Sequence, residues 1–460
     1  CDFAIVKPIF FDGAILGYAI NVAHYLDVGG SVPGSLAPNA VSVFQEGLRL
    51  PGVKIVRSDV FSDELLHIIG ENVRFPEIAL GDLTAQVATV RVAARRMTEL
   101  ATKYGEKIVR QAFVNLLDSS ERQSRAAIAA LPDGTYHAED VIDGDGVTED
   151  PIRVKVAVTI AGDRIIADFS GNPPAVAGPI NCARGALQSA TRTIVKALVA
   201  PQAPSNEGWF RPLEVVAEPG TIFTAEKPSP TGWYYEGSVH ASELVWKALA
   251  PLVPSRFSAG SYSSLCVVYL SGKDHSGEPF VHIEPQHGGW GASEDRDGAN
   301  AVIALTDGDT YNYSVEAIEA RFPIIVRQYA LNVEGGVGAG RRRGGFGVVR
   351  DYEILGDDAV AYCSLGRTKT LPWGMNGGAE GSPNVVQIIS DGGNSVRSYG
   401  RNPHIPLNRG DVVRIVTGGG GGWGDPAQRE RHLVEDDLLK GLISKEEASR
   451  VYGFVPGSVE

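Results

Sequence analysis

The sequence predicts a large α+β protein, in which mixed, mostly antiparallel sheets are flanked by helices and joined by glycine-rich turns. Three observations predict this fold class. Apolar residues recur at helical spacing through two consecutive stretches, residues 84–104 and 106–130. Apolar and polar residues then alternate from Ile152 to Ile160, as in a half-buried strand. Further on, to about residue 410, strand-like segments are punctuated by glycine, and the 55 glycines of the chain indicate many tight turns.

The first expected element is a hairpin of two strands, residues 3–10 and 15–23. The turn between them contains Asp12-Gly13, a dipeptide that favours tight hairpins. Asp2 stands at the start of one strand and His24 just past the end of the other. If the hairpin forms, these two side chains lie at the same end of it.

The elements after the hairpin are predicted from their periodicity and their breakers. Gly105 ends the first helix, and Pro132-Asp133-Gly134 ends the second. A turn at Gly162-Asp163 joins the strand at 152–160 to a second strand, and residues 183–200 form another helix. We expect soft boundaries near residues 150 and 425. The tail, residues 426–460, is expected to be helical, because Ser444-Lys445-Glu446-Glu447 has the pattern of a capping box.

Composition excludes several classes of function. The 460 residues are 43% hydrophobic, enough for a sizeable core, and the net charge of -13 disfavours binding of nucleic acid. The four cysteines are far apart, which predicts free thiols rather than a zinc ribbon or a disulfide framework. Neither a long apolar run nor a signal peptide is visible, so we expect no membrane span and a cytoplasmic protein.

The glycine-rich loops do not carry a nucleotide-binding motif. Neither the phosphate-loop pattern nor a G-x-G-x-x-G set between strand and helix occurs. The loop from Gly335 to Gly347, with its run Arg341-Arg342-Arg343, could hold an anion, although a turn with a solvated or subunit-facing arginine patch is the alternative. There is also no G-x-S-x-G elbow, and Ser238 with His240 is interpreted as a structural pair on a strand.

The first fifty residues bring together side chains suited to a metal. Asp2, Asp27 and Glu46 are carboxylates, His24 is an imidazole, and all four stand among apolar residues and glycine turns. Carboxylate and imidazole together suit zinc, manganese or iron, any of which can activate water or polarise a carbonyl. His240 and His287 are further candidates, but a lone histidine is more often an ordinary polar residue.

An ordered set of motifs resembles the hydantoinase B/oxoprolinase family over essentially the whole chain. The motifs are Ala23-His24-x-x-Asp27-Val28-Gly29-Gly30, Gln45-Glu46-Gly47-Leu48-Arg49, Gly81-Asp82-Leu83, Asp168-Phe169-Ser170-Gly171, Glu319-Ala320-Arg321-Phe322-Pro323 and the glycine run to Gly424-Asp425-Pro426. The resemblance implies a B-type catalytic region at residues 1–425. It also implies one subunit of an ATP-dependent cyclic-amide hydrolase of the hydantoinase or 5-oxoprolinase type.

In that family, ATP is bound mainly by a companion hydantoinase A-type subunit, which phosphorylates the carbonyl of a small cyclic amide. The B-type subunit holds a divalent metal that activates water, so the resemblance implies a hetero-oligomer. The matching ligand positions here are Asp2 and His24. We expect Asp27 to orient His24, Glu46 to act as an acid or base beside the ligands, and Tyr25 to donate a hydrogen bond to an oxyanion or merely to pack.

Two departures from the family pattern qualify the metal site. The first histidine of the family's His-x-x-Asp motif would fall three residues before Asp2, outside this sequence, so we expect the family's N-terminal segment to be missing and only half a site to be present. Family hydrolases also commonly have His-His where this sequence has His24-Tyr25. The alternatives are a subunit of an ATP-dependent ketone carboxylase and a catalytically silent assembly subunit.

Overall fold

The computed structural model describes residues 2–308, 310–400 and 404–454. The predictions for Cys1 and for residues 455–460 of the tail lie outside these ranges. Cys182, Cys266 and Cys363 are buried and form no disulfide within the described ranges, as the sequence predicts. Along the described ranges, no helix combines the length and the apolar composition that a membrane span requires.

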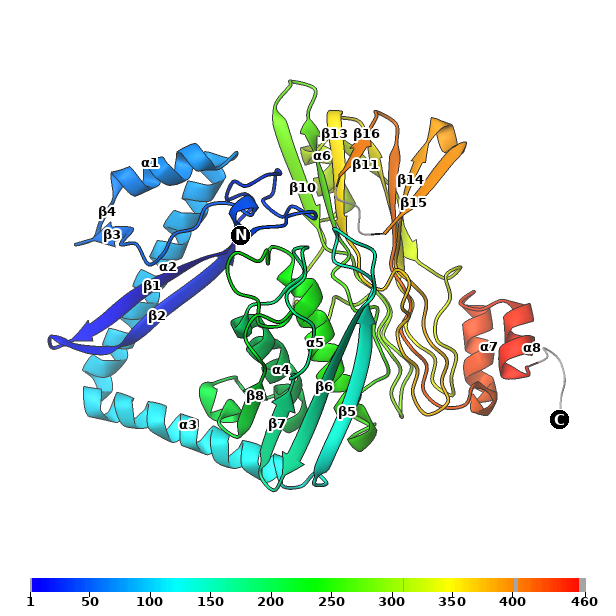
Figure 1. Ribbon diagram of the computed structural model, residues 1–460, viewed down its shortest axis with the longest axis horizontal. Coiled ribbons are helices and arrows are strands. Elements are labelled where there is room, and N and C mark those ends of the chain that lie inside the picture. The colour runs from blue at the N-terminus through cyan, green and yellow to red at the C-terminus, as the bar shows by residue number, and fades with distance from the viewer. Residues whose placement is uncertain (1, 309, 401–403, 455–460) are drawn as a thin grey trace.

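The N-terminal part is a hairpin laid against a long helix (Figure 1). β1 (Asp2–Phe11) and β2 (Ala14–His24) pair antiparallel, which confirms the predicted hairpin. α2 (Pro76–Tyr104) starts eight residues before the predicted helix and ends where the prediction places its end. The remaining elements of this part are β3 (Val56–Arg57), β4 (Val60–Phe61) and α1 (Asp63–Asn72).

A second layered unit follows, reached through α3 (Glu106–Ile128). Its sheet has the strand order β5-β6-β7-β8, antiparallel except for the β7–β8 pair. α4 and α5 pack together, and α5 contacts β5 and β6. β5 pairs with β6 across residue 150, so the soft boundary expected there falls inside a hairpin. The bounds are β5 (Gly134–Ile142), β6 (Ile152–Ala161), β7 (Arg164–Asp168), α4 (Arg184–Val199), β8 (Leu213–Val216) and α5 (Tyr234–Leu249).

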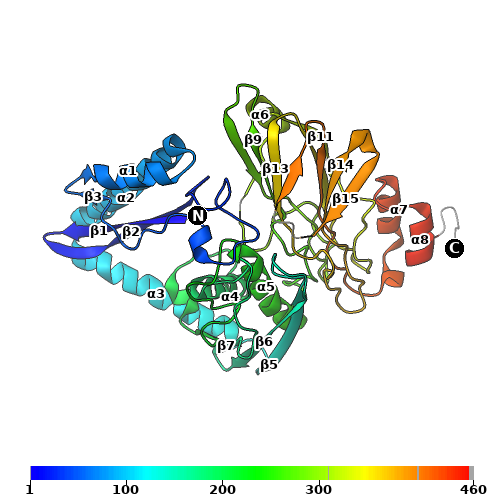
Figure 2. The same ribbon diagram turned by 45° about the horizontal axis from the view of Figure 1, so that its top comes forward.

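Two antiparallel sheets form most of the C-terminal half (Figure 2). The first has the order β10-β9-β13-β16 and the second the order β11-β12-β17-β14-β15. Mixed helices with mostly antiparallel sheets confirm the predicted α+β class. The bounds are β9 (Val267–Lys273), β10 (Pro279–Glu284), α6 (Val315–Arg321), β11 (Ile324–Leu331), β12 (Val348–Ile354), β13 (Asp357–Ser364), β14 (Val385–Ser390), β15 (Ser395–Tyr399), β16 (Ile405–Leu407) and β17 (Val412–Val416).

Below these sheets, the glycine-rich segments are not isolated turns but one packed bundle of extended chains (Figure 1). Residues 418–422 run between segments 288–292, 335–347 and 374–381, and bond to them through backbone groups. The Gly420 N–H donates to the Gly345 carbonyl at 2.9 Å, and the Gly422 N–H donates to the Ala379 carbonyl at 2.9 Å. A Cβ atom on Gly420 would lie 2.1 Å from the Trp290 carbonyl oxygen. Only glycine lets the backbones approach this closely.

The C-terminal tail packs as two short helices, α7 (Arg431–Leu439) and α8 (Lys445–Tyr452). The Ser444 side chain accepts a hydrogen bond from the Glu447 N–H, which confirms the predicted start of α8. An apolar cluster that includes Val434 and Ala448 joins the helices.

Candidate functional site

The β1–β2 hairpin places Asp2 directly opposite His24. The two residues are partners in the strand register, and His24 Nδ1 lies 2.9 Å from Asp2 Oδ1. Burial raises the pKa of Asp2, but the hydrogen bond and the charge of His24 outweigh it and hold that pKa below its usual value. The spatial pairing predicted from the Asp12-Gly13 turn is therefore present.

Asp27 is buried a short distance along the chain but does not bind His24. Its carboxylate accepts hydrogen bonds from the backbone N–H groups of Gly29 (2.9 Å), Gly34 (3.0 Å) and Arg74 (3.0 Å). The Arg74 guanidinium also donates to it at 3.0 Å. The expected role of Asp27 in orienting His24 is thus wrong. Asp27 is fully used in closing the glycine loop that follows β2 and tying it to the segment before α2.

Tyr25 points away from His24 and into the packing between the hairpin and α2. Its ring is fully buried, 4.7 Å from the ring of Phe3, and its hydroxyl donates to Gln86 Oε1 at 2.6 Å. Burial raises the pKa of Tyr25 well above its usual value. Of the two roles expected for Tyr25, packing fits this position, and donation to a substrate oxyanion does not.

Glu46 reaches across to the loop that leads into α5. Its Oε1 accepts from the backbone N–H groups of Thr231 at 2.8 Å and Gly232 at 2.6 Å. Burial raises the pKa of Glu46, and these two hydrogen bonds only partly counter it. The carboxylate therefore ties the N-terminal part to the helical unit, while its side chain also lines the cavity described next.

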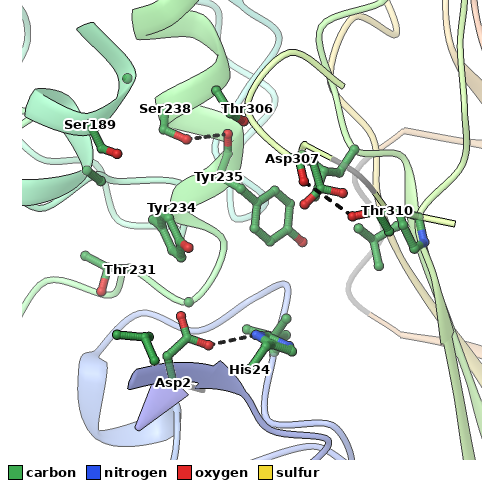
Figure 3. A pocket seen from close by; sticks show the side chains of 18 of the residues that line it. Asp2, His24, Ser189, Thr231, Tyr234, Tyr235, Ser238, Thr306, Asp307 and Thr310 are labelled. Carbon is green, nitrogen blue, oxygen red and sulfur yellow. Dashed lines mark hydrogen bonds and ion pairs between the residues drawn. The ribbon is translucent and has the colours of Figure 1, made fainter. Parts of the chain in front are cut away.

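Asp2, His24 and Glu46 line a cavity of about 620 Å³ (Figure 3). Its other walls come from α4, from the start of α5, from β9 and β10, and from the loop around Asp307. Figure 3 shows Tyr234 and Tyr235 between the Asp2 side of the cavity and Asp307. These residues were missed in the sequence because no local spacing connects them; the tertiary fold alone brings them together. The other polar residues of the lining are Ser189, Thr193, Thr231, Tyr234, Tyr235, Ser238, Thr306, Asp307 and Thr310.

The Asp2–His24 pair fits a metal in part. Apart from their mutual contact, neither side chain has a hydrogen-bond partner in the described ranges, so Asp2 Oδ2 and His24 Nε2 are available as ligand atoms. No group of three or more His, Cys, Asp or Glu side chains in those ranges is arranged to hold an ion. The described part of the chain thus places two side chains of ligand type at the cavity wall, and the metal site itself stays a prediction.

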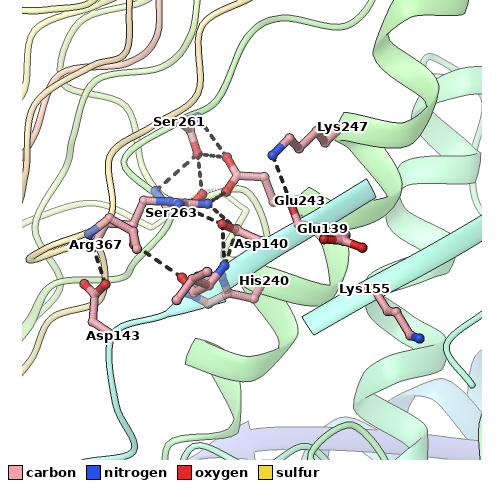
Figure 4. A network of polar contacts seen from close by, with 12 residues as sticks. Glu139, Asp140, Asp143, Lys155, His240, Glu243, Lys247, Ser261, Ser263 and Arg367 are labelled. Atoms are coloured by element: carbon pink, nitrogen blue, oxygen red, sulfur yellow. Dashed lines mark hydrogen bonds and ion pairs between the residues drawn. The ribbon is translucent and has the colours of Figure 1, made fainter. Parts of the chain in front are cut away.

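His240 and His287 lie elsewhere. His240 is buried on α5, where its Nδ1 lies 3.3 Å from Asp140 Oδ2 in a network with Arg367 and Glu243 (Figure 4). Ser238 is two residues earlier on the same helix, so the side chains of Ser238 and His240 do not face each other. The Ser238 hydroxyl donates to the Tyr235 carbonyl instead. The predicted structural pair of Ser238 and His240 is wrong for this reason. His287 Nε2 lies 3.4 Å from the Thr310 carbonyl oxygen.

The arginine run after Gly340 does not form an anion site. Arg343 binds the Asp437 carboxylate of α7 at 3.0 Å, and Arg342 binds the Glu430 carboxylate at 3.1 Å. Arg341 stacks on Trp423 and donates to the Glu294 carbonyl. Arg342 and Arg343 therefore hold the C-terminal tail against the glycine bundle, which corrects the interpretations of the run as an anion site and as a solvated patch.

The chain belongs to the hydantoinase B/oxoprolinase family, whose model matches residues 1–426. Among individual relatives, the chain is 32% identical to the B-type subunit of a putative D-/L-hydantoinase from Pseudomonas sp. (strain NS671). That match covers 98% of this chain and 78% of the relative.

Two solved structures share the fold. The ATP-dependent caprolactamase from Pseudomonas jessenii superimposes with a TM-score of 0.90 at 27% identity, covering 100% of this chain and 81% of the caprolactamase chain. A nucleotide-free acetone carboxylase superimposes with a TM-score of 0.89 at 20% identity, covering 99% of this chain and 67% of that chain. At this identity, the second likeness establishes the fold alone.

Proposed function

We propose that this chain is the metal-dependent hydrolytic subunit of an ATP-dependent cyclic-amide hydrolase of the hydantoinase or 5-oxoprolinase type. The observation that carries the proposal is the Asp2–His24 pair, set in the wall of a cavity large enough for a small ring. Family membership supports the reaction class, and the names of the hydantoinase and caprolactamase relatives support cyclic amides as substrates.

The residues divide the work as follows. Asp2 and His24 hold a divalent zinc, manganese or iron ion together with ligands from outside the described residues. When bound, such an ion supplies Lewis acidity and lowers the pKa of the water that it holds. Glu46 lies in the same wall, where burial raises its pKa, so its carboxyl group holds a proton more readily than an ordinary glutamate and is suited to proton transfer. Asp27 and Tyr25 position the loop and the hairpin that carry His24.

ATP is bound mainly by a hydantoinase A-type partner, which phosphorylates the amide carbonyl. This division agrees with the lack of a phosphate-binding loop in the sequence. The naming of the hydantoinase relative as one subunit of an enzyme supports a hetero-oligomer. Within the chain, we assign catalysis to residues 1–425 and a docking or closing role to the tail at 426–460.

Product analysis of the complex with the A-type partner tests the function. We expect ATP-dependent opening of a lactam or hydantoin to the corresponding acid. His24→Ala should lower this rate at least about a hundredfold without changing the circular dichroism spectrum. His67→Ala is the matched control, because His67 is an exposed histidine of α1. If the complex instead forms an acid from a ketone and bicarbonate, the chain is a subunit of a carboxylase. Full activity in His24→Ala would favour a catalytically silent subunit.

A further inference from the structure

The cavity has an uneven charge. Of its described lining residues, three are carboxylates, Asp2, Glu46 and Asp307, and none is lysine or arginine. Among those described residues, His24 is the only basic side chain. Arg49, three residues after Glu46, lines a neighbouring cavity instead. Sites that recognise a carboxylate or phosphate normally present arginine or lysine to it.

The acidic groups lie at separate ends of the cavity. Figure 3 shows Asp2 and His24 on one side and Asp307 across from them, with the Tyr235 ring between. In the described ranges, the Asp307 carboxylate has no hydrogen-bond or ion-pair partner, because the contacts at this residue are made by its backbone. Among the residues that the structure describes, no cation therefore forms an ion pair with it.

Apolar side chains also line the cavity. Side chains from three places in the chain contribute to it: Leu36 after the hairpin, Leu265 and Val267 at β9, and Ile283 in β10. Apolar and aromatic walls stabilise the carbon skeleton of a ring and exclude water from it. A ring whose scissile carbonyl lies at the Asp2–His24 end would extend over this wall toward Asp307.

On this basis we propose that the cavity selects uncharged cyclic amides and discriminates against those that carry a carboxylate, with Asp307 as a specificity-determining residue. The inference rests on the proposed function and narrows it to the uncharged substrates of that class, which disfavours 5-oxoproline itself. A cation held by Asp2 and His24 would offset charge at that end only, so a carboxylate on the far side of the ring would still meet Asp307. Like charges brought together in a partly dehydrated cavity repel strongly, which is a common way to reject a competing substrate.

A pair of probes with the same ring and nearly the same size isolates the effect of charge. 5-Oxoproline carries a carboxylate, and 5-oxoprolinamide carries a neutral amide in its place. We expect the complex with the A-type partner to bind the amide about tenfold more tightly by calorimetry without ATP, and kcat/KM to favour the amide to a similar degree. Equal or tighter binding of 5-oxoproline, or no binding of the amide, would overturn the proposal.

Asp307→Asn tests the assigned residue. The ratio of the two kcat/KM values should move toward 5-oxoproline by about tenfold, whereas Asp150→Asn, a change at an exposed carboxylate, should leave the ratio as it is. An unchanged ratio of the two kcat/KM values in Asp307→Asn would show that Asp307 does not determine the substrate preference. If no cyclic amide is hydrolysed, the proposed function fails, but the binding comparison on the unaltered protein still decides whether the cavity rejects anions.

Discussion

Two buried carboxylates, Asp27 and Asp143, stabilise loops by accepting hydrogen bonds from backbone N–H groups. Asp27 closes the loop after β2, and Asp143 accepts from the backbone of residues 368–370. The contact of Asp2 with His24 was predictable, because a tight turn sets the pairing of the two strands. The partners of Asp27 were not, since Arg74 lies 47 residues away and no local pattern indicates the contact.

Asp27→Asn should destabilise the protein by about 3 kcal/mol, because it leaves the Arg74 guanidinium without its buried charge partner. Urea unfolding measures the loss. Asp59→Asn breaks a comparable aspartate–arginine pair with Arg91, in which the aspartate is 82% exposed, and should cost less than about 1 kcal/mol. Equal effects of the two changes would mean that Asp27 does not anchor the loop.

Asp143 should make stability depend on acid pH. Burial raises its pKa, but the hydrogen bonds donated by Lys369, Thr370 and Thr368 outweigh burial and keep the pKa below 3.8. The unfolded chain therefore takes up a proton before the folded chain does. The stabilisation is complete well above pH 3.8 and is lost as the pH falls below it. In thermal unfolding between pH 3 and pH 6, Asp143→Asn should lose less stability on acidification than the unaltered protein; an identical slope would contradict this.

At the level of elements, regular periods were the reliable signal. The hairpin, α3, α4 and the β6–β7 pair follow from alternation, helical spacing and breakers. α5 was missed because residues 236–245 are all buried, polar ones such as Glu236, His240 and Glu243 included, so no exposed polar face opposes an apolar face to mark the helical period. The glycine clusters suggested separate turns, because a sequence does not show that several such segments pack side by side.

Gly420→Ala should destabilise the protein by about 3 kcal/mol or more, since its Cβ would overlap the Trp290 carbonyl inside the glycine bundle. Gly81→Ala is the opposite case, because a Cβ there meets nothing within 4 Å on helix α2. It should stabilise by about 1 kcal/mol. Thermal unfolding should show a lower melting temperature for Gly420→Ala and a higher one for Gly81→Ala. An unchanged melting temperature in Gly420→Ala would show that the backbone segments of the bundle can move apart.

On the scale of the whole molecule, the cavity joins parts of the chain that are far apart in sequence. The N-terminal hairpin supplies Asp2 and His24, the helical unit supplies Tyr234, and the C-terminal half supplies Asp307. The sequence motifs predicted that Asp2 and His24 lie together. They did not predict the position of Tyr234 or Asp307, which depends on long-range packing. The tail is held separately, where Arg343 and Arg429 bind Asp437 from two sides.

Arg429→Ala should loosen this tail, because the guanidinium joins Asp297 and Asp437 at 2.7 Å each in a buried position. Limited proteolysis should then release α7 and α8 several times faster than in the unaltered protein. Arg450→Ala, at an exposed position of α8, should not change the rate. Equal protection of Arg429→Ala would mean that apolar packing alone holds the tail.

Elemental analysis of the purified complex with the A-type partner tests the central claim most directly. It should find close to one equivalent of zinc, manganese or iron per copy of this chain, and His24→Ala should lose that metal while His67→Ala retains it. Metal content unaffected by the His24 change, or no metal in the active complex, would contradict the assignment of Asp2 and His24 as ligands.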